Sequence, residues 1–172
     1  GVAVLWSTWL FHAWEWQAIG EARPSATFVV DRPIVCLGDS LTSGMIPDPG
    51  YPAALKKMVS VPVINMGQSG IDTTAGLQRL IQALEHRPQL VIIELGGHDF
   101  LKGHPRSQTK SNLLSMISSC RSHGAEVILM EIPRGFMTDP FGSLEREIAY
   151  EEKVCLVPDV AIRQLVIWSP IC

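Results

Sequence analysis

The sequence lacks several features that would place it in common functional classes. It has no run of five like charges, and its net charge is −3 over 172 residues, so the basic patch of a nucleic-acid-binding protein is missing. Neither a GxGxxG dinucleotide fingerprint nor a GxxxxGK[ST] phosphate loop occurs. The 4 cysteines have no CxxC spacing, which argues against a zinc site and a redox dithiol. We therefore expect no nucleic-acid partner, no metal and no cofactor.

The composition nevertheless suffices for one folded domain. Hydrophobic residues make up 47% of the chain and charged residues 18%, which excludes a disordered chain and supplies a core. A length of 172 residues is typical of a single domain. We predict a hydrophobic N-terminal segment at residues 1–20, a polar linker at 21–31 and the folded domain at 32–172.

The N-terminal segment is unusual because it holds four of the chain's 5 tryptophans. Its uncharged run, from residue 2 to residue 14, is shorter than the roughly 20 apolar residues that span a bilayer. Three interpretations remain open: the distal part of a membrane anchor, the apolar stretch of an uncleaved signal sequence, or a helix packed on the domain or on a partner. The first two predict an extracytoplasmic or membrane-associated protein that is held at the membrane by residues 1–19.

Short apolar runs alternate with helical patterns from residue 27 onward. Five of these runs are almost continuously apolar, as expected for parallel strands buried on both faces: 34–37, 61–64, 90–95, 126–130 and 154–157. Helical patterns lie between them, at about 51–59, 72–84, 107–123 and 143–153. This alternation predicts an α/β fold, a three-layer α/β/α sandwich around a five-stranded parallel sheet.

Glycine-bearing loops follow the first three predicted strands, at residues 38–44, 65–70 and 96–99. Ligands of an open parallel sheet bind beyond the carboxyl ends of its strands, so we expect these loops to meet at one edge. A serine at such a turn can act as a nucleophile, and backbone N–H groups beside it can stabilise an oxyanion. Taken singly, each of these residues is more typical of an ordinary turn or helix cap.

The three loops contain blocks that resemble the signature of the GDSL, or SGNH, esterase and lipase family. The blocks are Gly38-Asp-Ser-Leu-Thr-Ser-Gly44, Asn65-x-Gly67-x-Ser69-Gly70-x-Asp72-Thr73 and Glu94-Leu-Gly-Gly-His-Asp99. The resemblance covers residues 32–160 and is strongest to the single-domain thioesterase, lysophospholipase and arylesterase branch. It implies a flavodoxin-like SGNH-hydrolase fold and the hydrolysis of carboxylic or thio esters, with a small acyl ester or a lipid as substrate.

The resemblance also implies roles for individual residues. Ser40 would be the nucleophile that forms an acyl-enzyme, and the backbone N–H groups of Ser40 and Gly70 would form part of the oxyanion hole. The loops would be supported by Gly38, Asp39 and Asp99.

The third block departs from the family because His98 replaces the asparagine that supplies a side-chain donor to the oxyanion. An imidazole can offer one N–H to the oxyanion, or it can accept a proton from Ser40. We prefer the donor role, because the family's residue at this position faces the oxyanion rather than the serine hydroxyl. A divergent site with weak activity is the third interpretation.

The family's general base, which comes from a late Asp-x-x-His motif, is not found in this chain. None of the 5 histidines follows an aspartate at that spacing, and Asp159-Val-Ala-Ile162 ends in isoleucine instead. We expect the domain to be incomplete at its C-terminus, with the base and its aspartate in the continuation. A serine without a base is a weak nucleophile, so a non-catalytic binding module is the alternative function.

Glu94 is a further candidate, because it lies in the apolar third strand. A carboxylate buried in such a strand needs a hydrogen-bonding or charged partner. Lys102 and Arg134 are the cations that we consider for this role.

Overall fold

The computed structural model describes residue 29 and residues 31–45, 49–132 and 141–158. Within these ranges a single sheet contains five parallel strands in the order β2-β1-β3-β4-β5. The strands are β1 (Ile34–Gly38), β2 (Val63–Asn65), β3 (Leu90–Glu94), β4 (Glu126–Met130) and β5 (Cys155–Val157). The predicted parallel sheet is confirmed, and each strand lies within one or two residues of its predicted range.

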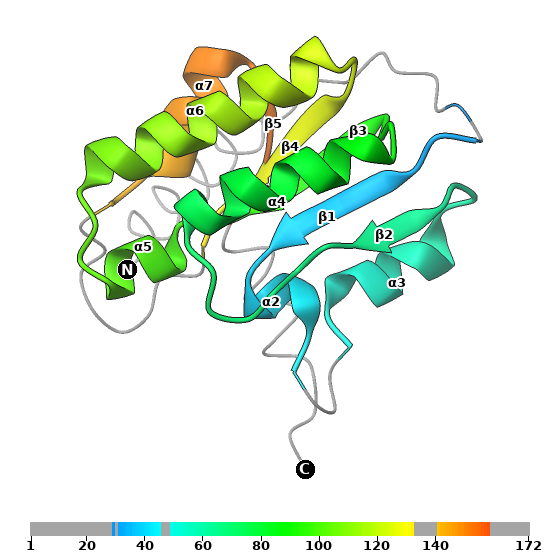
Figure 1. Ribbon diagram of the computed structural model, residues 1–172, viewed down its shortest axis with the longest axis horizontal. Helices are drawn as coiled ribbons and strands as arrows, with labels where there is room; N and C mark the ends of the chain where they lie inside the picture. The colour runs from blue at the N-terminus through cyan, green and yellow to red at the C-terminus, as the bar shows by residue number, and fades with distance from the viewer. Residues whose placement is uncertain (1–28, 30, 46–48, 133–140, 159–172) are drawn as a thin grey trace, which may run out of the picture.

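Four helices of eight or more residues lie between the strands (Figure 1). They are α3 (Tyr51–Met58), α4 (Thr73–Glu85), α6 (Arg106–Ser122) and α7 (Leu144–Glu152). Two short helices, α2 (Ser40–Ser43) and α5 (Gly97–Leu101), occupy stretches that the sequence pattern predicts as loops. Helices of 4 and 5 residues are too short to show an apolar period, which is why the pattern misses them.

The ends of the longer helices follow local sequence signals. Asp72 is the N-cap of α4, where its Oδ1 accepts a hydrogen bond from the Ala75 N–H at 2.9 Å. Helix α6 ends at Ser122, and Gly124 then adopts a φ of +69°, the left-handed conformation that commonly follows a helix.

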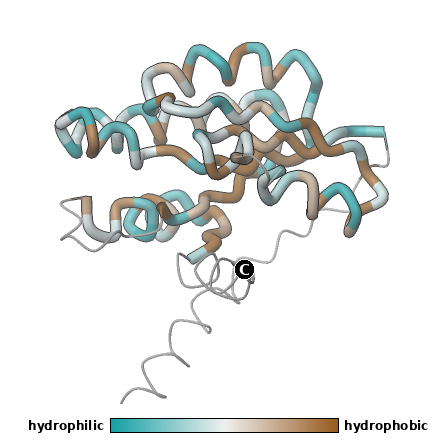
Figure 2. Tube along the Cα trace, turned by 90° about the horizontal axis from the view of Figure 1, so that it is seen from below, coloured by the Kyte–Doolittle hydropathy of each residue, from teal (hydrophilic) through white to brown (hydrophobic). Residues whose placement is uncertain are grey.

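Two apolar clusters cover the two faces of the sheet, because alternate strand residues point to opposite sides. Val35 and Leu37 belong to the larger cluster, which packs against α4, α6 and α7. Ile34 and Cys36 belong to the smaller cluster, which packs against α3 and the segment that follows it. In Figure 2 apolar colouring is concentrated along the strands, and hydrophilic colouring on the outer turns of the helices. The α/β/α layering is therefore confirmed.

The described chain begins beside the end of the sheet opposite the glycine-bearing loops. The Val29 N–H donates to Gln89 Oε1 at 2.8 Å, and the Arg32 guanidinium donates to the carbonyl oxygens of Arg87, Pro88 and Gly124. The predicted hydrophobic segment at 1–20 and most of the predicted linker at 21–31 lie outside the described residues. None of the helices in the described ranges has the length and apolar character required to cross a membrane.

Candidate active site

The first three strands end at the same edge of the sheet, and their following turns lie side by side there (Figure 1). Strand β1 lies between β2 and β3, with Gly38 in register with Glu94 and Cys36 in register with Asn65. From β1 the chain first adds β2 on one side and then crosses to add β3 on the other. An open parallel sheet binds its ligand at such a reversal, beyond the carboxyl ends of the strands. The structure therefore brings the three glycine-bearing loops together.

Ser40 is the first residue of the short helix α2, directly after β1. Asp39 is the N-cap of that helix, and its Oδ1 accepts a hydrogen bond from the Leu41 N–H at 3.0 Å. The Ser40 side chain is partly exposed, and neither its hydroxyl nor its backbone N–H has a hydrogen-bond partner among the described residues. A free hydroxyl and a free N–H at a helix N-terminus are available to a bound carbonyl group.

The second loop packs against α2 through two residues of the second family block, Asn65 and Gly67. Asn65 donates to the Thr42 carbonyl at 2.9 Å and accepts from the Gly67 N–H at 2.9 Å. A Cβ at Gly67 would lie 2.3 Å from the Ser43 nitrogen, so only glycine permits this close approach.

Gly70 follows in the left-handed region with a φ of +81°, a conformation that side chains other than glycine rarely adopt. The space that a Cβ would occupy is open, and its backbone N–H has no hydrogen-bond partner in the described part of the chain. The second loop therefore also offers an unpaired donor.

Glu94 lies fully buried at the end of β3, beneath the turn that carries Ser40. Its Oε2 accepts hydrogen bonds from the Asp39 N–H at 3.2 Å and from the Thr42 hydroxyl at 2.9 Å. Burial and, secondarily, the Asp39 carboxylate hold the pKa of Glu94 well above its ordinary value, which favours the protonated form. Our expectation that Lys102 pairs with Glu94 is wrong, since Lys102 pairs with Asp72, and Arg134 lies outside the described residues.

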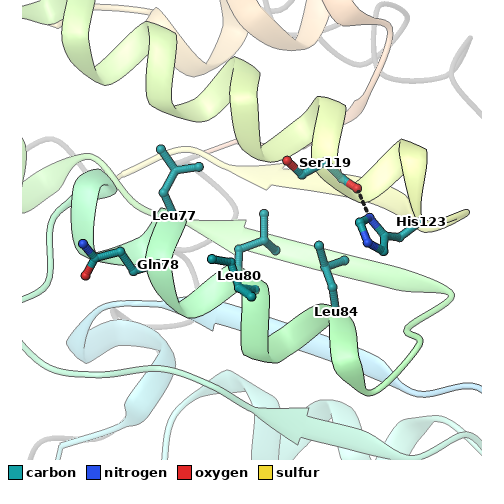
Figure 3. A pocket seen from close by; sticks show the side chains of 7 residues that line it. Leu77, Gln78, Leu80, Leu84, Ser119 and His123 are labelled. Carbon is teal, nitrogen blue, oxygen red and sulfur yellow. Dashed lines mark hydrogen bonds between the residues drawn. The ribbon is translucent and has the colours of Figure 1, made fainter.

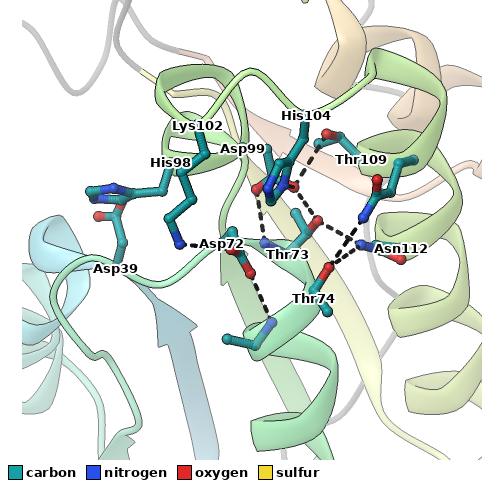
Figure 4. A network of polar contacts seen from close by, with 12 residues as sticks. Asp39, Asp72, Thr73, Thr74, His98, Asp99, Lys102, His104, Thr109 and Asn112 are labelled. Atoms are coloured by element: carbon teal, nitrogen blue, oxygen red, sulfur yellow. Dashed lines mark hydrogen bonds and ion pairs between the residues drawn. The ribbon is translucent and has the colours of Figure 1, made fainter.

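His98 extends from α5 toward the Asp39 turn, as Figure 4 shows. Its Nε2 lies 3.7 Å from Asp39 Oδ2, which is within the range of an ion pair and longer than a hydrogen bond. The His98 side chain is 26% exposed, whereas that of Asp39 is 8% exposed. The residue that departs from the family pattern is therefore next to the residue that precedes Ser40.

Asp99, the next residue on α5, is fully buried and points away from His98 into the scaffold (Figure 4). Its carboxylate accepts from the Thr73 N–H at 2.8 Å, the Thr73 hydroxyl at 2.5 Å and the Thr109 hydroxyl at 3.3 Å. His104 Nδ1 lies 3.6 Å from the same carboxylate. Asp99 thereby ties α5 to the first turn of α4 and to α6.

A salt bridge joins α5 to the loop that contains Gly70. Lys102 Nζ lies 2.7 Å from Asp72 Oδ2, and this hydrogen bond is the main reason that the pKa of Asp72 lies below its ordinary value. Asp72 thus holds both the start of α4 and the end of α5.

The buried cysteines do not compete with Ser40 as nucleophiles. Burial raises the pKa of the Cys36 thiol to about 11 and that of the Cys120 thiol to about 12. A thiol is nucleophilic only as its thiolate, so neither group is reactive at neutral pH.

An apolar groove on the outer surface lies between α4 and α6, away from this edge (Figure 3). It has a volume of about 400 Å³ and is lined by Leu77, Gln78, Leu80, Ile81, Leu84, Ser119 and His123. It contains no carboxylate and no glycine-bearing turn, so it has none of the groups that the three loops share.

Comparisons with known proteins identify the family of this chain. The model of the GDSL-like lipase/acylhydrolase family matches residues 36–156, which include all three loops. The chain belongs to this family. It is a GDSL/SGNH hydrolase, and its relatives support ester hydrolysis.

Two relatives and one solved structure illustrate how far the family likeness extends. The chain is 37% identical to an arylesterase of Vibrio mimicus over 78% of its own length and 74% of the relative's. It is 34% identical to the esterase TesA of Pseudomonas aeruginosa over 73% of its length and 69% of the relative's. The crystal structure of AlinE4, an SGNH-hydrolase family esterase, superposes on this chain with a TM-score of 0.68 at 27% sequence identity. The superposition covers 84% of this chain and 83% of the AlinE4 chain.

Proposed function

We propose that this GDSL-family hydrolase cleaves carboxylic or thio esters through an acyl-enzyme on Ser40. The Ser40 oxygen attacks the acyl carbonyl carbon, and the alcohol or thiol leaves with a proton. Water then attacks the acyl-enzyme, which releases the carboxylic acid and restores the hydroxyl. The observation that carries the proposal is the partly exposed Ser40 hydroxyl, which has no hydrogen-bond partner among the described residues and lies at the edge where the three family blocks meet.

The oxyanion of the tetrahedral intermediate is proposed to accept hydrogen bonds from three donors. Two are the unpaired backbone N–H groups of Ser40 and Gly70, and the third is the His98 side chain. Donors that are already in place stabilise this charge strongly, and loss of a single one typically costs about 10²–10³ in turnover.

The proton acceptor for Ser40 belongs to the proposal as well. Among the described residues no histidine forms a hydrogen bond with the Ser40 hydroxyl. We propose that the base comes from outside the described ranges, as in the family's late motif. His98 as the base remains the alternative.

Hydrolysis of short p-nitrophenyl esters tests the proposal. We expect Ser40→Ala to lower kcat by at least about 10³-fold, because the nucleophile is removed. Ser43→Ala is a matched control on the same short helix, since its hydroxyl only approaches the Gly44 carbonyl at 3.4 Å. Equal rates in wild type and Ser40→Ala would contradict the proposal.

A non-catalytic binding module is the second candidate function, favoured because no histidine of the described ranges is hydrogen-bonded to the Ser40 hydroxyl. This candidate predicts that an alkyl carboxylate binds at the Gly70 loop without any ester turnover. Isothermal titration with butyrate, in parallel with the ester assay, distinguishes the two functions.

Membrane association through residues 1–19 is a separate proposal, which would keep the domain near a lipid substrate. It predicts that the full chain sediments with phosphatidylglycerol vesicles and that a chain starting at residue 21 does not. Equal sedimentation of both chains would contradict it.

A further inference from the structure

The turn that holds Ser40 and the helix that holds His98 share one carboxylate. Asp39 Oδ1 accepts the Leu41 N–H and thereby caps α2, while Asp39 Oδ2 faces His98 Nε2 at 3.7 Å. The carboxylate is shielded, because Asp39 is only 5% exposed, so its charge acts on the imidazole with little screening by water. One buried group is thus placed between the proposed nucleophile and the proposed third donor.

Asp39 is the only ion-pair partner of His98 in the described ranges. Lys102, one turn further along α5, is turned to Asp72, and His104 lies beside Asp99 (Figure 4). Glu94 accepts the Asp39 N–H, and the Asp39 carboxylate also interacts with the Glu94 carboxyl, whose pKa it helps to raise. The Asp39 carboxylate is therefore the group that can fix the orientation of the His98 ring.

The contact between Asp39 and His98 matters because position 98 holds a histidine in place of the family's asparagine. A carboxamide has its donor on a short side chain and needs no charged partner. A neutral imidazole has a single N–H, and the groups that face the two ring nitrogens decide which nitrogen carries it. A carboxylate opposite Nε2 restrains the ring and leaves Nδ1 as the nitrogen turned away from Asp39. Nδ1 can donate to the oxyanion only when it carries a hydrogen, as it does in the doubly protonated ring.

We infer that Asp39 is a positioning residue that acts on ester hydrolysis through His98. The inference rests on the proposed function of Ser40 and His98 and adds a specific dependence between two residues. Asp39 contributes to turnover while His98 is present and has little left to contribute when residue 98 is asparagine.

A double-mutant cycle on kcat for p-nitrophenyl acetate tests this dependence. Asp39→Asn keeps an oxygen that can cap α2 but removes the charge opposite His98. We expect Asp39→Asn to lower kcat about 10-fold with little change in KM, and to lower it less than about 2-fold in the His98→Asn background. A purely structural cap would give the same loss in both backgrounds, and that result would overturn the inference.

Asp72→Asn serves as the matched control, because Asp72 is also a helix N-cap but pairs with Lys102 and does not face His98. Its effect on kcat is expected to be equal in the wild-type and His98→Asn backgrounds. A coupling with residue 98 as large as that of Asp39 would show a general loosening of the site and would overturn the inference.

A measurement that needs no turnover separates this inference from the proposed function. In ¹H–¹⁵N spectra of the imidazole side chains, assigned with His98→Asn, the His98 ring signals should shift in Asp39→Asn and stay in place in Asp72→Asn. Unchanged His98 signals in Asp39→Asn would overturn the contact itself. Loss of the proposed function would instead appear as undiminished ester hydrolysis in Ser40→Ala.

Discussion

The short helix α5 carries two neighbouring residues that take part in different aspartate–histidine pairs. His98 faces Asp39 at 3.7 Å and Asp99 faces His104 at 3.6 Å, so the distances are nearly equal. The surroundings differ. The Asp99 carboxylate has three hydrogen-bond donors from α4 and α6, whereas Asp39 Oδ2 faces the His98 imidazole and the Asp39 carboxylate also interacts with the carboxyl of Glu94.

The comparison shows that distance alone does not identify a functional pair. A buried carboxylate with a full set of donors holds structural elements together, and its histidine adds little. A shielded carboxylate that still faces a partly exposed imidazole, next to an unpaired serine, is available to support chemistry. We therefore assign Asp99–His104 to the scaffold and Asp39–His98 to the site.

Within this comparison, the largest expected difference is between the variants that remove the two histidines. His98→Ala should lower kcat for p-nitrophenyl acetate by about 100-fold, because one oxyanion donor is lost. His104→Ala should change kcat by less than about 3-fold, since Asp99 keeps its threonine donors. Steady-state kinetics of the two variants decides the comparison, and equal losses would contradict it.

For stability we expect the opposite ranking of the two pairs: changing Asp99 should cost more than changing Asp39. Asp99→Asn should lower the free energy of unfolding by about 3 kcal/mol, because an amide group would oppose buried N–H and O–H donors. Asp39→Asn should lower it by less than about 1 kcal/mol, because asparagine is an equally good N-cap. Urea denaturation measures both values, and a larger loss for Asp39→Asn would contradict the assignment.

The smallest effect concerns Glu94, which lies beneath the Asp39 pair. Its raised pKa means that the folded state holds this proton more tightly than the unfolded chain does, whose carboxyl has the ordinary pKa of 4.5. The stability from this group is complete below that value and is lost as the pH rises toward the folded pKa.

Glutamine has no proton to lose, so Glu94→Gln should gain stability relative to wild type as the pH rises. The difference between pH 4 and pH 8 should be on the order of 1 kcal/mol in favour of the variant. Thermal unfolding at both pH values gives the measurement. A difference that does not change with pH would show that Glu94 is ionised in the folded protein.

The sheet and the longer helices could be predicted because they bury regular apolar patterns. The run at 90–95 and the period of Leu77, Leu80, Ile81 and Leu84 each indicate one kind of element. Helices α2 and α5 could not be predicted in this way, because their residues are fixed by caps and by tertiary contacts such as that of Asp99 with Thr73.

The candidate site was predictable as a set of loops and less so as a set of contacts. Gly67 is required by a close approach to Ser43, and Asn65 binds the Thr42 carbonyl, neither of which a single sequence reveals. The predicted cationic partner of Glu94 is wrong, because a carboxyl with a raised pKa needs no cation and is satisfied by a backbone N–H and a threonine hydroxyl. The segments 1–20 and 159–172 lie outside the described residues, so the anchor and the interpretation of the Asp159 segment stay predictions.

The most direct test of the central claim is to identify the residue that a fluorophosphonate modifies. The full chain is treated with the probe, digested and mapped by mass spectrometry, with Ser40→Ala and Ser43→Ala treated in parallel. We predict one adduct on the peptide that contains Ser40, present in wild type and Ser43→Ala and missing in Ser40→Ala. An adduct on another residue, or one that persists in Ser40→Ala, would contradict the account.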